Sequence, residues 1–148
     1  MTAIPFLDLA AQQAEIMDEI EPLVLETLRT AHFVGGPRLY TFEAEYAAFV
    51  GTSHCIGAGN GTDAIELILR ACNISAGDEV ILPANTFIAT AEAVVRAGAT
   101  VVLADVDPVS LLLSPDSVAA AATSRTRAVI PVHLYGQCAD MPAIKKIA

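Results

Sequence analysis

Hydrophobic and polar residues follow a helical period in the first part of the chain. A helix is predicted over residues 8–29, because its apolar positions recur every three or four residues: Ile16, Ile20, Leu23, Val24 and Leu28. Pro22 predicts a kink or a restart there, because proline lacks the N–H that a helix interior uses. A turn is expected at residues 34–37 and a second helix at about 40–50, with Gly51 as its closing residue.

Farther along the chain, short apolar segments alternate with amphipathic ones. Strands are expected at residues 55–58, 79–82, 100–104 and 128–132. Helices are expected at residues 62–72, 87–97, 115–122 and from about 141 onward. The strand segments are apolar throughout, which is typical of strands buried on both faces. This order predicts an α/β fold with a mainly parallel sheet sandwiched by helices.

The loops that follow the predicted strands carry most of the distinctive polar residues of the chain. In a parallel sheet with right-handed crossovers these loops lie at one edge, where ligands of open α/β sheets bind. They are residues 57–61, 83–86, 105–107 and 133–137. The sequence therefore predicts a ligand site at this edge.

The loop at residues 57–61 and the residues after it form a glycine-rich turn, Gly57-Ala58-Gly59-Asn60-Gly61-Thr62-Asp63-Ala64. Small residues let backbone N–H groups approach a ligand, and the positive end of a helix suits a phosphate. No Gly-Lys-Ser/Thr follows, so the turn is not a P-loop. A dinucleotide fold would need a third glycine at Thr62 and an acid where Pro83-Ala84-Asn85 stands. An ordinary turn with Thr62 or Asp63 as helix cap is the other interpretation.

Composition narrows the class of protein. The chain has 148 residues, of which 54% are hydrophobic, enough for one domain with a core. A formal net charge of -9 argues against a nucleic-acid surface and against adhesion to anionic membranes. Neither a signal peptide nor an apolar membrane span is visible in the sequence. Cys55, Cys72 and Cys138 are expected to be buried free thiols, which favours a cytoplasmic protein.

Several motifs, in their order and spacing, resemble the N-terminal part of the DegT-type sugar aminotransferases. They are Pro5-Phe6-Leu7-Asp8-Leu9, Gly59 to Ala64, Gly77 to Ile81, Pro83 to Thr90, Asp105 to Pro108 and Pro131 to Met141. The resemblance covers essentially the whole chain. It implies a pyridoxal 5'-phosphate enzyme of fold type I that acts on nucleotide-linked keto sugars. It further implies an N-terminal arm and helix at residues 1–30 and an incomplete large, cofactor-binding domain at residues 31–148.

The resemblance also implies site residues. Gly61, Thr62 and Asp63 would hold the cofactor phosphate, mainly through backbone N–H groups and the Thr62 hydroxyl. Phe87 would stack on the pyridine ring, since a planar heteroaromatic needs an apolar face to fix its tilt. Without the family, Phe87 would be interpreted as a core residue at the start of its helix.

Other polar residues at the same edge receive no catalytic role. His133 is either an acid–base group or a hydrogen-bonded structural residue, and Tyr135, Asn85 and Gln137 lie in the same predicted loops. Asp105 and Asp107 precede Pro108, which favours a turn over a metal site. No metal site is expected.

The resemblance places the Schiff-base lysine and the aspartate beside the pyridine nitrogen beyond Ala148. No catalytic residue is therefore expected in this chain, which alone should be inactive. The intact protein would be a homodimeric aminotransferase with a nucleotide-sugar substrate and glutamate as the amino donor. Three alternatives stay open: a sugar dehydratase of the same family, a dinucleotide-binding domain, and a non-catalytic remnant that pairs with another chain.

Overall fold

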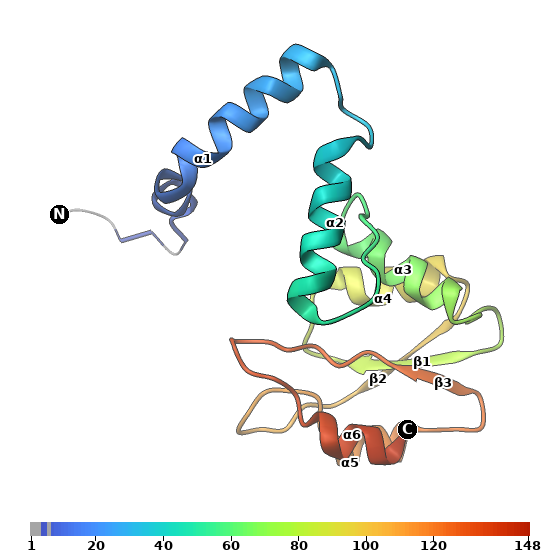
Figure 1. Cartoon of the computed structure of the whole chain (residues 1–148). Helices are drawn as coiled ribbons and strands as arrows, with labels where there is room; N and C mark the ends of the chain where they lie inside the picture. Colours follow the sequence, from blue (N-terminus) through green and yellow to red (C-terminus); the bar gives the residue numbers. More distant parts are fainter. Residues whose placement is uncertain (1–3, 6) are drawn as a thin grey trace. The chain divides into compact units, whose positions relative to one another are not determined.

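A computed structural model describes residues 4–5 and 7–148 of the chain (Figure 1). Residues 1–3 and 6, which belong to the predicted N-terminal arm, lie outside the described residues. The chain divides into two compact units, Met1–Gly57 and Ala58–Ala148. None of the described helices combines the length and apolar character that crossing a membrane requires.

The described residues of the first unit form two helices, α1 (Leu9–Thr30) and α2 (Pro37–Val50). Asp8 caps α1 by accepting a hydrogen bond from the Ala11 N–H at 3.0 Å. The helix runs through Pro22 without a break, so the restart expected there does not occur. The second helix starts earlier than predicted, since Pro37 needs no N–H partner in a first turn. It ends as predicted at Gly51, whose φ of 73° is left-handed.

The second unit is built on a parallel sheet with the strand order β2-β1-β3. The strands are β1 (Glu79–Pro83), β2 (Thr100–Ala104) and β3 (Thr126–Val129). The predicted mainly parallel α/β sheet is confirmed. The strand predicted at residues 55–58 was wrong: among the described residues this segment has no ladder partner, and a strand exists only beside another strand.

Helices cover both faces of the sheet, as Figure 1 shows. One face carries α3 (Gly61–Ala71) and α4 (Ile88–Arg96), and the other carries α5 (Pro115–Ala121) and α6 (Met141–Ile147). Each lies within one residue of its predicted start and end where both were predicted. The unit is therefore a three-layer α/β/α arrangement.

The alternation of side chains along β1 builds two cores. Val80 and Leu82 pack with the helices of one face, around Leu69 and Val94, whereas Ile81 packs on the other face. The second core also contains the buried side chains of Leu112, Leu113, Val118 and Ile144. Only β1 is buried along its whole length, because β2 and β3 each have a single neighbour. The expectation that all strands are buried on both faces holds for β1 alone.

The path of the chain through the sheet positions the candidate site. The chain leaves β1 through α4 to β2 and then returns through α5 to β3, on the opposite side of β1. The carboxyl ends of β1 and β3 therefore flank a topological switch point, where the crossovers diverge to opposite faces. The loops that follow these two strands contain Asn85, His133 and Tyr135.

Candidate functional site

The turn before α3 is organised by Asn60. Its side-chain oxygen accepts a hydrogen bond from the Asp63 N–H at 2.9 Å, and its carbonyl accepts one from the Ala64 N–H at 3.0 Å. Asn60 has an extended backbone, as a helix cap requires. The helix cap is therefore Asn60, and the alternative with Thr62 or Asp63 as cap was wrong.

The two N–H groups that follow the cap point to a ligand site. Within the described part of the chain, neither the Gly61 N–H nor the Thr62 N–H has a hydrogen-bond acceptor. Apart from its chain neighbours and its own helix, a Cβ built on Gly61 would meet no atom within 4 Å, so Gly61 is not packed against the rest of the described chain. Two available amides and a hydroxyl at the positive end of an eleven-residue helix are a donor set that suits a phosphate group.

The carboxylates of this turn are paired with arginines. One oxygen of Asp63 lies 3.0 Å from Arg96 Nη1, and the other accepts a hydrogen bond from Asn60 Nδ2 at 2.9 Å. The two oxygens of Glu66 are bound at 2.8 Å, one by Arg96 Nε and the other by Arg70 Nε. The acidic side chains of the first turns are thus compensated by guanidinium groups, which lowers their repulsion of an incoming anion.

Phe87 lies at the start of α4, where it is the residue before the first helical turn. Its side chain is 76% exposed, so the interpretation of Phe87 as a core residue was wrong. It lines a shallow apolar hollow of about 310 Å³ together with Leu82, Ala84, Ile88 and Leu103. Gly61, Thr62 and Asp63 are not among the lining residues of that hollow.

The loops at the switch point meet through Asn85 and Tyr135. Asn85 Nδ2 lies 3.5 Å from the phenol oxygen of Tyr135, which links the loop after β1 to the loop after β3. Tyr135 has a φ of 58°, a left-handed conformation that is unfavourable for a residue with a side chain. His133 Nδ1 accepts a hydrogen bond from the Ala139 N–H at 3.2 Å, which is the structural role that sequence reasoning left open.

The acids after β2 form a turn. Asp107 accepts hydrogen bonds from the N–H groups of Val109 at 3.0 Å and Ser110 at 2.7 Å. These bonds, with that of Ser110 the strongest, lower the pKa of the Asp107 carboxyl. Within the described residues no three His, Cys, Asp or Glu side chains are grouped as metal ligands.

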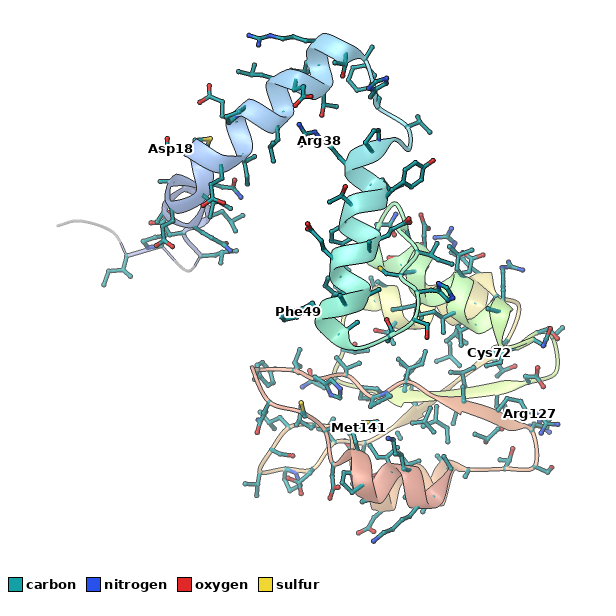
Figure 2. All side chains as sticks on the ribbon, viewed as in Figure 1. Asp18, Arg38, Phe49, Cys72, Arg127 and Met141 are labelled. Carbon is teal, nitrogen blue, oxygen red and sulfur yellow. The ribbon has the colours of Figure 1, made fainter. Side chains whose placement is uncertain are left out.

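The cysteines are free, but they are less buried than the sequence predicted. Cys72, which is labelled in Figure 2, and Cys138 are exposed, and Cys55 is half-buried. Cys72 closes α3, and Cys138 follows the loop at 133–137, so neither position belongs to a core cluster.

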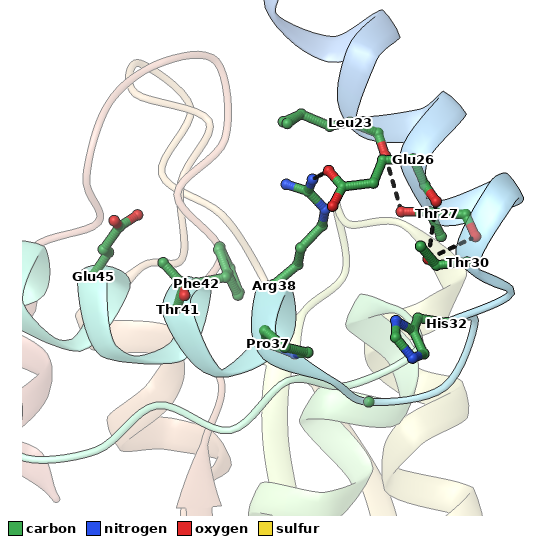
Figure 3. Close-up of a pocket in the computed structure, with 11 residues that line it drawn as sticks. Leu23, Glu26, Thr27, Thr30, His32, Pro37, Arg38, Thr41, Phe42 and Glu45 are labelled. Atoms are coloured by element: carbon green, nitrogen blue, oxygen red, sulfur yellow. Dashed lines mark hydrogen bonds and ion pairs between the residues drawn. The ribbon is translucent and has the colours of Figure 1, made fainter.

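One large hollow is lined by none of the predicted site residues. It belongs to the first unit, between α1 and α2, and has a volume of about 670 Å³. Figure 3 shows Arg38 of α2 directed toward Glu26 of α1, with which it forms an ion pair. Leu23 and Phe42 are apolar residues that line the hollow. Sequence reasoning missed this hollow, because nothing in a helical repeat indicates the gap between two helices.

Comparison with known proteins decides the family. Residues 14–148 match the DegT/DnrJ/EryC1/StrS aminotransferase family. The chain belongs to this family. The resemblance stated from the motifs is thereby confirmed over nearly the whole sequence.

Two relatives of this DegT-family chain carry names of sugar-nucleotide aminotransferases. UDP-N-acetyl-3-dehydro-alpha-D-glucosamine 3-aminotransferase of Acidithiobacillus ferrooxidans is 49% identical over 147 residues, 99% of this chain and 40% of the relative. UDP-2-acetamido-2-deoxy-3-oxo-D-glucuronate aminotransferase of Pseudomonas aeruginosa is 46% identical over 145 residues, 98% of this chain and 40% of the relative. The chain thus spans about two-fifths of the length of these relatives.

Solved structures agree in fold. DesV of S. venezuelae superimposes on 100% of this chain and 40% of its own, with a TM-score of 0.94 and 42% identity. NtdA of Bacillus subtilis, solved with bound cofactor PMP, matches 100% of this chain and 34% of its own, with a TM-score of 0.92 and 36% identity. Members of the family therefore bind PMP, a form of the pyridoxal 5'-phosphate cofactor.

Two residues of the turn's hydrogen-bonded network escaped sequence reasoning. Asn60 could have been found, since Asn followed three residues later by an acid is a helix-start signal. Arg96 could not, because it lies on another helix and only the packing of α3 on α4 brings it to Asp63.

Proposed function

We propose that this chain is the N-terminal, phosphate-binding portion of a pyridoxal 5'-phosphate-dependent aminotransferase that acts on nucleotide-linked keto sugars. The observation that carries the proposal is the pair of available N–H groups at Gly61 and Thr62, in a chain that matches the family over residues 14–148. Bound here, the cofactor would supply the electron sink that amine transfer needs.

The residues of the site contribute to cofactor binding in different ways. The N–H groups of Gly61 and Thr62, and the Thr62 hydroxyl, donate to phosphate oxygens. The Asp63 N–H already donates to Asn60, so Asp63 acts by shaping the turn rather than through its own amide. Phe87 offers an exposed ring face to the pyridine, which accounts for a phenylalanine that is 76% exposed.

The substrate class follows from the names of the relatives. The names of both relatives specify a UDP-linked sugar with a keto group at carbon 3. The proposed acceptor is therefore a 3-keto sugar attached to a nucleoside diphosphate, and glutamate is the proposed amino donor. The intact protein would work in the cytoplasm as a homodimer. Since both relatives are named aminotransferases, transfer is favoured over the dehydratase alternative.

The phosphate part of the proposal can be tested on the chain itself by NMR. The ¹⁵N-labelled chain is titrated with pyridoxal 5'-phosphate, with inorganic phosphate and with pyridoxal, which lacks the phosphate. The amide signals of Gly61 and Thr62 should shift with the first two ligands and stay in place with pyridoxal. Shifts confined to other residues, or equal shifts with pyridoxal, contradict the proposed site.

The activity can be tested by comparing two polypeptides. One is this chain, and the other is the product of the reading frame extended downstream of codon 148. Each is incubated with pyridoxal 5'-phosphate, glutamate and a UDP-linked 3-keto sugar, and 2-oxoglutarate is measured. We expect product from the extended polypeptide and none from this chain. Turnover by this chain alone contradicts its proposed inactivity, and an extended polypeptide without turnover contradicts the proposed reaction.

A further inference from the structure

We propose that Arg96 is a positioning residue for the cofactor phosphate and that it acts through Asp63. This inference rests on the function proposed above and assigns a role to a residue outside the phosphate-binding turn. Arg96 is the last residue of α4, whereas the turn precedes α3.

The first step of the argument is the fixed orientation of the Asp63 carboxylate. Arg96 Nη1 holds one oxygen at 3.0 Å and Asn60 Nδ2 holds the other at 2.9 Å. Asn60 also accepts the Asp63 N–H at 2.9 Å, so Asn60 and Asp63 bind each other reciprocally. The carboxylate therefore cannot rotate without breaking one hydrogen bond and one ion pair. Arg96 thus helps to fix the orientation of the carboxylate.

The second step is the rigidity of Arg96 itself. Its Nε binds Glu66 at 2.8 Å, and its carbonyl oxygen accepts a hydrogen bond from Arg70 at 2.6 Å. Glu66 is also held by Arg70, and its side chain is only 15% exposed. Arg96, whose side chain is 45% exposed, is thus held by contacts at both its side chain and its backbone carbonyl. A guanidinium suits this position because its fork can bind two carboxylates at once.

The third step is electrostatic. A phosphate at Gly61 and Thr62 would lie next to Asp63 in the sequence, and two uncompensated anions at this separation repel each other. The positive charge of Arg96 compensates the Asp63 carboxylate. The dipole of α3 and the amides of Gly61 and Thr62 then attract the phosphate without repulsion from Asp63. The role of Arg96 thus depends on the negative charge of Asp63, and this dependence can be measured.

A double-mutant cycle tests the inference in the full chain. Arg96→Met is expected to raise the Kd for pyridoxal 5'-phosphate about 5-fold, in the range of a single partly exposed charge interaction. The Kd for pyridoxal should stay unchanged. In an Asp63→Asn background, the same Arg96→Met change should alter the Kd less than about 2-fold, because the charge that Arg96 compensates is absent.

Arg70→Met is the matched control. It also removes one positive charge and one ion pair with Glu66, and it removes the hydrogen bond to the Arg96 carbonyl, but among the described residues Arg70 has no hydrogen bond or ion pair with Asp63. It should change the preference for pyridoxal 5'-phosphate over pyridoxal less than Arg96→Met does, because it leaves the ion pair between Arg96 and Asp63 in place. Circular dichroism of each variant checks that its helices are retained. Should Arg96→Met fail to fold, Arg96→Lys keeps the charge while losing the fork, and we expect an intermediate loss of phosphate affinity.

The outcomes separate this inference from the proposed function. No phosphate-dependent binding by the unsubstituted chain overturns both. The positioning role alone is overturned if the unsubstituted chain binds pyridoxal 5'-phosphate but Arg96→Met changes its Kd equally with and without the Asp63 carboxylate. The positioning role is also overturned if Arg96→Met lowers the affinity for pyridoxal as much as the affinity for pyridoxal 5'-phosphate. It is overturned as well if Arg70→Met raises the Kd for pyridoxal 5'-phosphate as much as Arg96→Met does.

Discussion

Arg125 Nε lies 2.9 Å from a carboxylate oxygen of Glu79, a buried acid at the amino end of the central strand. The Thr123 hydroxyl donates a hydrogen bond to the other oxygen. The bond from Thr123 first, and then that from Arg125, lower the pKa of Glu79, while burial acts in the opposite direction. Glu79 is thus a charged group that joins β1 to the segment leading into β3.

This pair predicts how stability depends on pH. The pKa of Glu79 in the folded chain is below its ordinary value of 4.5, so its stabilising contribution is complete above 4.5. The contribution is lost as the pH falls through the lowered pKa. Urea midpoints measured from about pH 7 to about pH 3 should fall less steeply for Glu79→Gln than for the unsubstituted chain. Glu92→Gln, at an exposed position of α4, should leave the profile unchanged.

The central strand should carry more stability than its neighbours. Leu82 is fully buried in β1, and Leu82→Ala should reduce the free energy of unfolding by about 2 to 5 kcal/mol. Leu103 of β2 is 61% exposed, so Leu103→Ala should change it by about 0.5 kcal/mol or less. Urea denaturation monitored by circular dichroism gives both values. Equal losses in the two variants would contradict the burial pattern.

The cap of α3 should be measurable as well. Asn60→Ala removes the acceptor of the Asp63 N–H and should reduce the free energy of unfolding by about 1 kcal/mol. Asn60→Ser retains a capping oxygen and should lose only part of this amount. A loss as large for serine as for alanine would show that the contact with the Asp63 carboxylate, rather than the cap, is the important one.

Phe87 provides a test of cofactor stacking that is separate from folding. Phe87→Leu should raise the Kd for pyridoxal 5'-phosphate by about 2- to 13-fold, because an aromatic contact contributes about 0.5 to 1.5 kcal/mol. Stability should be unaffected, since the side chain is 76% exposed. Ile88→Ala, the neighbouring exposed position, serves as the control. Absorbance titration gives the affinities, and an unchanged Kd for Phe87→Leu rules out the stacking role.

The fold could be predicted where a segment determines its own structure. The apolar run at residues 79–82 and the amphipathic pattern of residues 62–72 indicated β1 and α3 almost to the residue. Residues 55–58 look equally strand-like, but strand formation depends on a neighbour that no local pattern contains. The burial of β1 and the exposure of Leu103 also escaped prediction, because strand order decides which apolar runs are covered.

The candidate site shows the same division. Gly61 and Thr62 could be proposed from the sequence because a glycine-rich turn before a helix suits an anion. The pairing of Asp63 with Arg96, and of Asn85 with Tyr135, joins residues from different elements. Such contacts follow from helix packing and strand order, so local sequence cannot supply them.

The two outer strands, β2 and β3, each present one row of main-chain N–H and C=O groups without a neighbouring strand in the described sheet. Such rows can recruit strands from other molecules. In a concentrated preparation, molecules of this chain should therefore associate edge to edge into extended sheets. The time for which a sample stays free of such assemblies would then depend on its protein concentration more than on its melting temperature.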